Sequence, residues 1–172
     1  MCSGDVVAHE RRRDFSPLDL DRVACADENA WIISSAVNFC ARVFPAVSLD
    51  SPDAPALLVL GRYLQDGFLH QHIREQGGAY GGGASYDSET ATFRFYSYRD
   101  PRLSDTFHDF NKSIDWFLSD TNSRRLEESI LGSIRTIDVP SSAAGAAEKS
   151  FNLDLFGYSD NIKKKFREGV LD

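Results

Sequence analysis

The sequence predicts an α+β fold, in which helices pack on one face of a largely antiparallel sheet. Three observations support this prediction: an early run of alternating apolar residues, two short strand-like runs after a helix, and helical patterns from there to the C-terminus. This order lacks the regular β-α-β alternation of a doubly wound nucleotide-binding fold, and it is typical of an α+β sandwich.

Length and composition indicate one globular domain. The chain has 172 residues, of which 42% are hydrophobic and 12% aromatic, so it can bury a core without disulfides. We expect residues 1–28 to be a polar N-terminal arm or a short helix and residues 29–172 to be a single α+β domain. The formal net charge of -7 argues against nucleic acid and anionic membranes as partners.

Cysteine usage and hydropathy predict the compartment. Cys2, Cys25 and Cys40 form no CxxC motif and leave an odd residue over, which favours a reducing environment with cysteine as a small apolar side chain. No run of about 18 apolar residues is present, so no membrane span is expected. We therefore expect a cytoplasmic protein. The alternative is an organelle matrix, if the whole protein carries a transit peptide that this chain lacks.

The first predicted element is a long strand. Apolar and polar residues alternate over residues 31–43, with a bend expected near Ser34 and Ser35. Next, Ser51, Pro52 and Asp53 provide a helix start before an apolar run. We expect a helix over residues 54–74, with this stripe on its buried face: Leu57, Leu60, Leu64, Phe68, Ile73.

A glycine-rich stretch at residues 77–83 is expected to end that helix as a loop. Two strands follow in the prediction, at residues 84–86 and 92–98, and Asp100-Pro101 then breaks the chain.

The remaining chain reads as helices. The cleanest amphipathic pattern predicts a buried stripe of five residues: Leu103, Phe107, Phe110, Ile114, Phe117. The next helix is expected to bury Leu126, Ile130, Ile134 and Ile137 and to stop before Pro140. A further helix would start near Ser142, reach Phe156 and end at Gly157. A last one, capped by Ser159, would run through Phe166.

The glycine-rich stretch does not match a phosphate-binding motif. GGAYGGG satisfies neither GxGxxG nor GxxxxGK[ST], and it follows a helix instead of a strand. Two readings of Tyr80 remain open from spacing alone. Either the stretch is a helix C-cap with Tyr80 packed, or the glycines let the backbone approach a ligand to which the Tyr80 phenol donates a hydrogen bond.

Metal-ligand and nucleophile motifs are missing from the sequence. The four histidines, His9, His70, His72 and His108, form no HExxH. The inverted HxxEH is nearly written from His72 to Glu75, but Gln76 replaces its second histidine. We therefore predict no metal ligands in this chain and expect histidines on a solvated helix face. No GxSxG nucleophile motif occurs either.

Two longer stretches are more specific. IREQGGAYGGGA and FYSYRDP, with sequence around them over roughly residues 30–172, resemble the C-terminal part of presequence-protease-type zinc metallopeptidases, in the pitrilysin/insulinase superfamily. The resemblance implies a metallopeptidase-like α/β sandwich domain from a long protein of two hinged halves that close around an unfolded peptide. In that family the N-terminal half binds zinc through HxxEH.

The resemblance also implies roles for two residues. The family's arginine and tyrosine match Arg74 and Tyr80, and Tyr80 would donate its phenol to the scissile carbonyl while Arg74 helps to fix the peptide backbone. A neighbouring sheet edge would pair with the substrate strand. Arg99, by contrast, is expected to form a structural ion pair with a nearby carboxylate.

The chain departs from the family in having no HxxEH. We therefore expect a C-terminal domain of a zinc-dependent peptidase for unfolded oligopeptides that is inactive alone, with zinc and the N-terminal half as partners. The alternative is a non-catalytic peptide-binding or assembly module. In either case the isolated domain is expected to expose apolar surface that a sister domain normally covers, and this surface would favour self-association.

Overall fold

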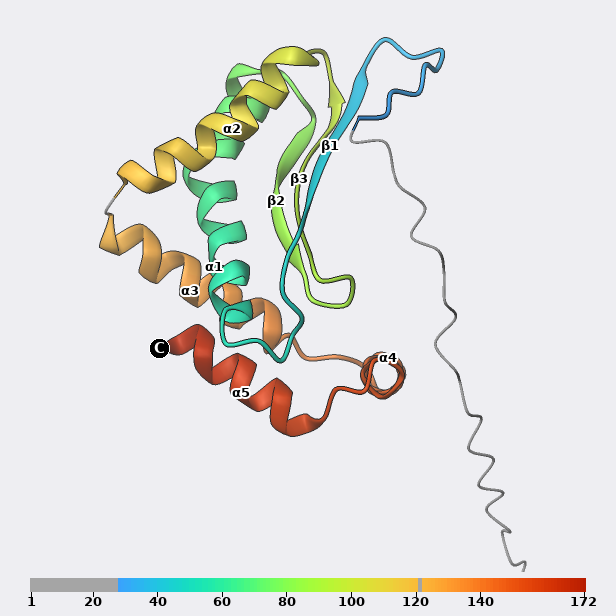
Figure 1. Cartoon of the computed structure of the whole chain (residues 1–172), viewed down its shortest axis with the longest axis vertical. Helices are drawn as coiled ribbons and strands as arrows, with labels where there is room; N and C mark the ends of the chain where they lie inside the picture. Colours follow the sequence, from blue (N-terminus) through green and yellow to red (C-terminus); the bar gives the residue numbers. More distant parts are fainter. Residues whose placement is uncertain (1–27, 121) are drawn as a thin grey trace, which may run out of the picture. The chain divides into compact units, whose positions relative to one another are not determined.

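The computed structural model describes residues 28–120 and 122–172, and shows a three-stranded antiparallel sheet with helices on one side (Figure 1). The strands are β1 (Asn38–Pro45), β2 (Gly81–Asp87) and β3 (Thr92–Asp100), in the order β1-β3-β2. Residues 35–172 form one compact unit. The predicted α+β class is confirmed, whereas the arm expected at residues 1–28 lies almost entirely outside the described residues.

The first strand is shorter than its alternating pattern predicts. Residues 28–37 contain no strand, and β1 begins only at Asn38. The register explains this start, since β3 supplies partners from Asn38 opposite Asp100 to Pro45 opposite Thr92. Alternation shows that a segment suits a sheet, but a strand also requires a neighbour to complete its hydrogen bonds.

The predicted long helix is confirmed as two joined segments. Helix α1 (Ala54–Leu64) continues directly into η1 (Gln65–Gln76), which is wound as a π-helix. Together they place Leu64, Leu69 and Ile73 in the core. The sheet contributes Phe95 and the next helix Phe110, whose ring centroids lie 5.5 Å apart.

The glycine-rich stretch is only partly a loop. Residues 77–80 connect η1 to the sheet, but Gly81, Gly82 and Gly83 belong to β2. The prediction of a loop through residue 83 was therefore wrong, because pairing of these glycines with Tyr98, Ser97 and Tyr96 overrides their weak strand propensity.

Among the described residues after β3 there are four helices: α2 (Ser104–Ser119), α3 (Ser123–Ile137), α4 (Ala143–Leu155) and α5 (Asp160–Leu171). Two predicted starts are confirmed by side-chain caps. Ser142 accepts from the Gly145 N–H at 3.2 Å, and Ser159 accepts from the Ile162 N–H at 3.4 Å. Helix α5 continues five residues beyond the expected end at Phe166.

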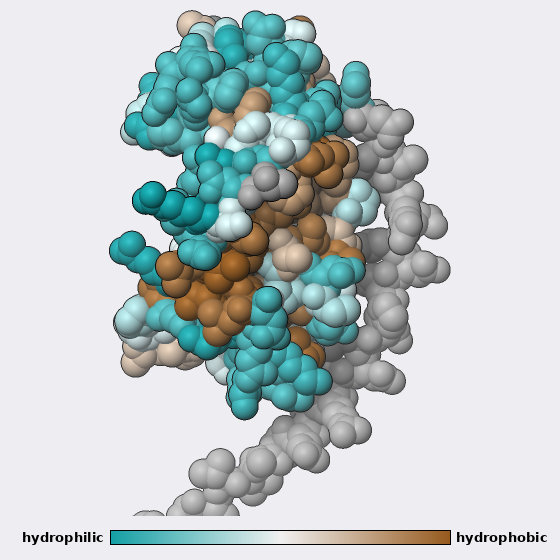
Figure 2. All heavy atoms as spheres, turned by 90° about the vertical axis from the view of Figure 1, so that its left-hand side faces the viewer, coloured by the Kyte–Doolittle hydropathy of each residue, from teal (hydrophilic) through white to brown (hydrophobic). Residues whose placement is uncertain are grey.

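The buried faces of α2 and α3 differ from the predicted apolar stripes. Small or polar residues are buried instead, namely Thr106, Asp109 and Ser113 on α2 and Ser129 and Ser133 on α3, with Phe110 the one member of either predicted stripe that is fully buried. Small side chains let α3 approach α1 closely, which leaves larger apolar residues at the flanks. Leu126 stays 46% exposed, and Figure 2 shows hydrophobic side chains gathered on this helical side of the molecule.

Candidate functional site

Tyr80 stands in the connection between η1 and β2 with its side chain 61% exposed. Its backbone N–H donates to the carbonyl oxygen of Arg99 at 3.3 Å, and its ring centroid lies 5.3 Å from that of Tyr98. The phenol oxygen has no hydrogen-bond partner among the residues that the structure describes. The ring is therefore held in place while the hydroxyl remains available to a ligand.

The turn before Tyr80 is built by the end of η1. The Gly78 N–H donates to the Arg74 carbonyl and the Ala79 N–H donates to the Ile73 carbonyl, each at 3.1 Å. Gly78 has a φ of 81°, a left-handed conformation that glycine adopts without strain. The helix C-cap reading is thus right for the turn, but Tyr80 itself is not packed in the core.

Arg74 lies exposed in the last turn of η1, six residues before Tyr80. Its carbonyl oxygen takes part in the turn, whereas its guanidinium makes no hydrogen bond or ion pair with any described residue. The two residues singled out by sequence therefore flank one short turn, and both present polar groups to solvent.

Arg99 does not form the predicted ion pair with any described residue. Its guanidinium carbon lies 5.8 Å from the centroid of the Tyr80 ring, a cation–π contact. The carboxylates nearby are already paired with another arginine, because Arg102 contacts Asp100 at 3.7 Å and Asp109 at 3.0 Å. The ion pair predicted for Arg99 was therefore wrong, since Arg102 is the arginine that pairs with these carboxylates.

Arg102 forms a cluster with Asp100, Thr106 and Asp109 next to the turn that leads to Tyr80. Asp100 is fully buried and accepts hydrogen bonds from the Thr106 hydroxyl at 2.7 Å and the Arg102 N–H at 2.9 Å. Arg102 also donates to the His72 carbonyl near the end of η1, at 3.3 Å. This ties the end of β3, the start of α2 and the end of η1 together.

Gly77 is essential to that arrangement. A Cβ on Gly77 would lie 2.0 Å from Nη2 of Arg102, so any larger residue would displace the guanidinium. Arg102 can cross the end of η1 only because this position carries no side chain. The glycine thus serves close approach, in a backbone conformation that other residues also adopt.

The histidines of the described chain have ordinary surroundings. His70 lies 3.4 Å from Glu75, and His72 stacks on Phe68 with ring centroids 3.7 Å apart. Across residues 28–120 and 122–172, no three His, Cys, Asp or Glu side chains gather as metal ligands, and no helix is long and apolar enough to cross a membrane.

Cys40 is buried in the core, as predicted for a cysteine acting as a small apolar residue. Burial raises the pKa of its thiol, which keeps it protonated and unreactive. Cys2 and Cys25 lie outside the described residues.

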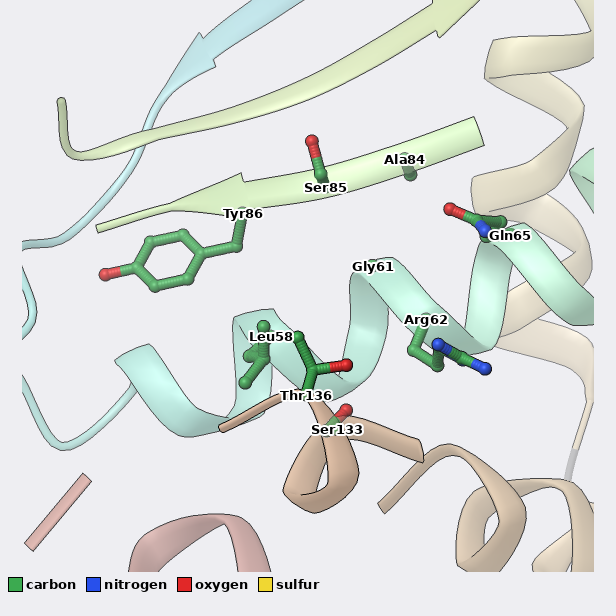
Figure 3. A pocket seen from close by; sticks show the side chains of 9 residues that line it. All are labelled: Leu58, Gly61, Arg62, Gln65, Ala84, Ser85, Tyr86, Ser133 and Thr136. Carbon is green, nitrogen blue, oxygen red and sulfur yellow. The ribbon is translucent and has the colours of Figure 1, made fainter. Parts of the chain in front are cut away.

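Two hollows lie away from Tyr80. A small pocket of about 120 Å³ lies between α1, β2 and α3, with Ser85 pointing away from α1 (Figure 3). An apolar groove of about 450 Å³ lies between β1, β3, α1 and α2, and Leu57, Phe93 and Ile114 line part of it. Neither hollow brings together a nucleophile and a general base among its lining residues.

The chain that carries this site is similar to a known family of proteins. Residues 28–172 match the family model described as the PreP C-terminal domain. The chain is 36% identical over 138 residues to "Presequence protease, mitochondrial" of Kluyveromyces lactis, covering 79% of this chain and 14% of that protein. The Mus musculus protein of the same name is 34% identical over 145 residues, covering 84% and 14%. The chain thus spans about one seventh of these relatives.

The names of these relatives contradict the cytoplasmic location expected from composition. Proteins from Kluyveromyces lactis, Mus musculus and Saccharomyces cerevisiae are all named as mitochondrial. Acidic charge and cysteine usage exclude some environments, but they cannot distinguish the cytoplasm from another reducing aqueous compartment.

Proposed function

This chain belongs to the presequence protease family as a C-terminal domain, and from that premise we propose that it completes the active site of a zinc-dependent peptidase. The observation that carries this proposal is the Tyr80 phenol, which is exposed and without a partner in the described structure although its ring and backbone are held. A donor fixed in this way before substrate arrives is suited to stabilise charge that develops during reaction.

Tyr80 acts on the substrate in this proposal. Its hydroxyl donates a hydrogen bond to the oxygen of the scissile carbonyl, and the bond strengthens as negative charge develops on that oxygen. Zinc, held by the N-terminal half, would polarise the same carbonyl and activate a water. This chain would supply the hydrogen-bond donor and the N-terminal half would supply the metal, so hydrolysis would require both halves.

Arg74 and the edge of the sheet bind the peptide chain. The Arg74 guanidinium, exposed and unpaired among the described residues, is placed to donate to backbone carbonyls of an extended substrate. Strand β2 is an edge strand, and its first residues directly follow Tyr80. A substrate added to this edge would present its carbonyls beside the phenol.

The rest of the parent protein is the proposed partner. Exposed apolar side chains lie on α2 and α3, among them Leu118 at 76% and Leu131 at 67%. Contiguous exposed apolar surface marks interaction sites, and we propose that sister-domain surface covers it in the whole protein. In the isolated chain the same surface would favour self-association, which sedimentation at increasing concentration would detect.

Cleavage of a quenched fluorescent, unstructured peptide tests the proposal. We expect no turnover by this chain with zinc, none by a zinc-bearing half from a family member, and turnover when the two are combined. Loss of that turnover with Tyr80→Phe would place the phenol in the reaction. Zinc-dependent turnover by the chain alone, after exclusion of contaminating protease, would contradict the proposal. Peptide binding without any turnover in the combined protein would favour a non-catalytic module.

A further inference from the structure

The end of β3 contains a β-bulge at Arg99. Asn38 of β1 pairs with Asp100 and the next residue, Phe39, pairs with Tyr98, so Arg99 is the extra residue on β3. Its φ is 51°, in the left-handed region where bulges of this kind usually carry glycine. An arginine in this conformation is uncommon, and it must be maintained by its surroundings.

The bulge determines which side chains face inward. Along β3, buried Phe93, Phe95 and Ser97 alternate with outward residues, and this alternation would place Arg99 inside and Asp100 outside. The structure has the reverse, with Asp100 fully buried and Arg99 exposed. One extra residue thus places a carboxylate in the Arg102 cluster and moves a guanidinium to the surface that carries Tyr80.

Arg99 then contacts Tyr80 in two ways. Its carbonyl oxygen accepts the Tyr80 N–H at 3.3 Å, and its guanidinium carbon lies 5.8 Å from the ring centroid. The ring of Tyr98 also contacts the ring of Tyr80, with the two centroids 5.3 Å apart and the ring planes inclined by 57°. The bulge therefore supports both the backbone and the ring of Tyr80, while the phenol stays free.

We propose that Arg99 is a positioning residue for Tyr80, held in a left-handed bulge so that its guanidinium fixes the orientation of the tyrosine ring toward the substrate. This inference rests on the proposed function of Tyr80. Arg99 itself contacts neither substrate nor metal in the proposal. Arg99 restricts the exposed ring before substrate binds, so Tyr80 loses less conformational entropy when its phenol donates to the oxygen on which charge develops.

The test compares variants of the combined, zinc-bearing protein. Arg99→Gly suits the left-handed backbone and retains the carbonyl, but it removes the guanidinium. We expect its unfolding midpoint to be equal to or above that of the parent chain. Its kcat should fall about 2- to 5-fold, the effect expected of an exposed cation–π contact, with KM unchanged. Arg99→Lys, which retains a cation near the ring, should recover part of the loss.

A double-mutant cycle separates positioning from a general structural effect. In a Tyr80→Phe background no hydroxyl remains to be oriented, so Arg99→Gly should lower kcat no further. An unchanged kcat in Arg99→Gly, or an equal loss in both backgrounds, would overturn the role of Arg99. If Tyr80→Phe itself leaves kcat unchanged, the proposed function of Tyr80 fails instead, so the two failures are distinguishable.

Discussion

Two tyrosines lie near opposite ends of the same edge strand, and their hydroxyl groups have different surroundings. Tyr86, near the end of β2, is half-buried and its hydroxyl donates to the Val47 carbonyl at 2.7 Å. Tyr80, just before β2, is exposed, and its hydroxyl has no partner among the described residues. One phenol is already used in joining two segments of the fold. The other is held only by its ring and backbone, as expected of a group reserved for a ligand.

The frames behind the two tyrosines differ as well. Tyr86 lies against the loop after β1, whereas Tyr80 follows a turn whose helical end is bonded to the cluster of Asp100 and Arg102. Within that cluster Asp100 is fully buried, and its carboxylate accepts hydrogen bonds from the Thr106 hydroxyl and the Arg102 backbone N–H. The cluster of Asp100 and Arg102 therefore stabilises the fold, whereas the neighbouring Tyr80 presents a free hydroxyl to solvent. Substitutions should separate the two properties.

The largest effect on stability is expected from Asp100→Ala. The substitution removes the acceptor for Thr106 and leaves Arg102 with one buried carboxylate fewer, which should cost about 3 kcal/mol of unfolding free energy. Urea denaturation measures this loss. Asp115→Ala, at an exposed position of α2, is the matched control and should stay within about 0.5 kcal/mol of the parent. Equal effects at the two positions would contradict the importance of the cluster.

Gly77→Ala should have the next largest effect. Its Cβ would meet the Arg102 guanidinium, so the bond from Arg102 to the His72 carbonyl must be lost or strained, at a cost of about 2 kcal/mol. Gly145→Ala in α4 is the control, because a Cβ there meets neighbours only at 3.5 Å. The control should raise the unfolding free energy by about 0.5 kcal/mol. A neutral Gly77→Ala would show that Arg102 adapts without loss.

Tyr86→Phe should cost about 1 kcal/mol, the usual value of one hydrogen bond, with turnover of the combined protein unchanged. Its pH dependence is more informative. Burial raises the pKa of Tyr86 to about 12 from the ordinary value of 10.0, so the folded state favours the neutral phenol. That stabilisation is complete below about pH 10 and decreases as pH rises toward 12. Denaturation from pH 9 to about 12 should show a shallower fall in Tyr86→Phe than in the parent.

Much of the fold follows from the sequence because its signals are local. The helix starts at Ser142 and Ser159 could be predicted, since a capping side chain acts within one turn of its own residue. The stripe on α3 could not, because Ser129 and Ser133 are buried through close approach to another helix. Periodicity reports which residues are apolar, but not which neighbour requires a small side chain.

The candidate site divides in the same way. Tyr80 and Arg74 were predicted from a resemblance carried by one contiguous stretch, and the structure shows both exposed around a single turn. Arg99 was assigned the wrong interaction, because one extra residue in β3 reverses the inward and outward positions that alternation predicts. A non-glycine residue before Asp100-Pro101 carries no sequence signal for a left-handed bulge. Such a feature depends on the register with β1, which only the structure gives.

The most direct test of the central claim is kcat of the combined, zinc-bearing protein with Tyr80→Phe, measured beside the unfolding free energy of the variant chain. If the Tyr80 phenol donates to the reacting carbonyl, kcat should fall on the order of 100-fold, with the unfolding free energy within about 0.5 kcal/mol of the parent. Unchanged kcat would contradict the claim that the free phenol acts in the reaction. A loss of kcat accompanied by a comparable loss of unfolding free energy would also contradict it, because Tyr80 would then have a structural role, as Tyr86 has.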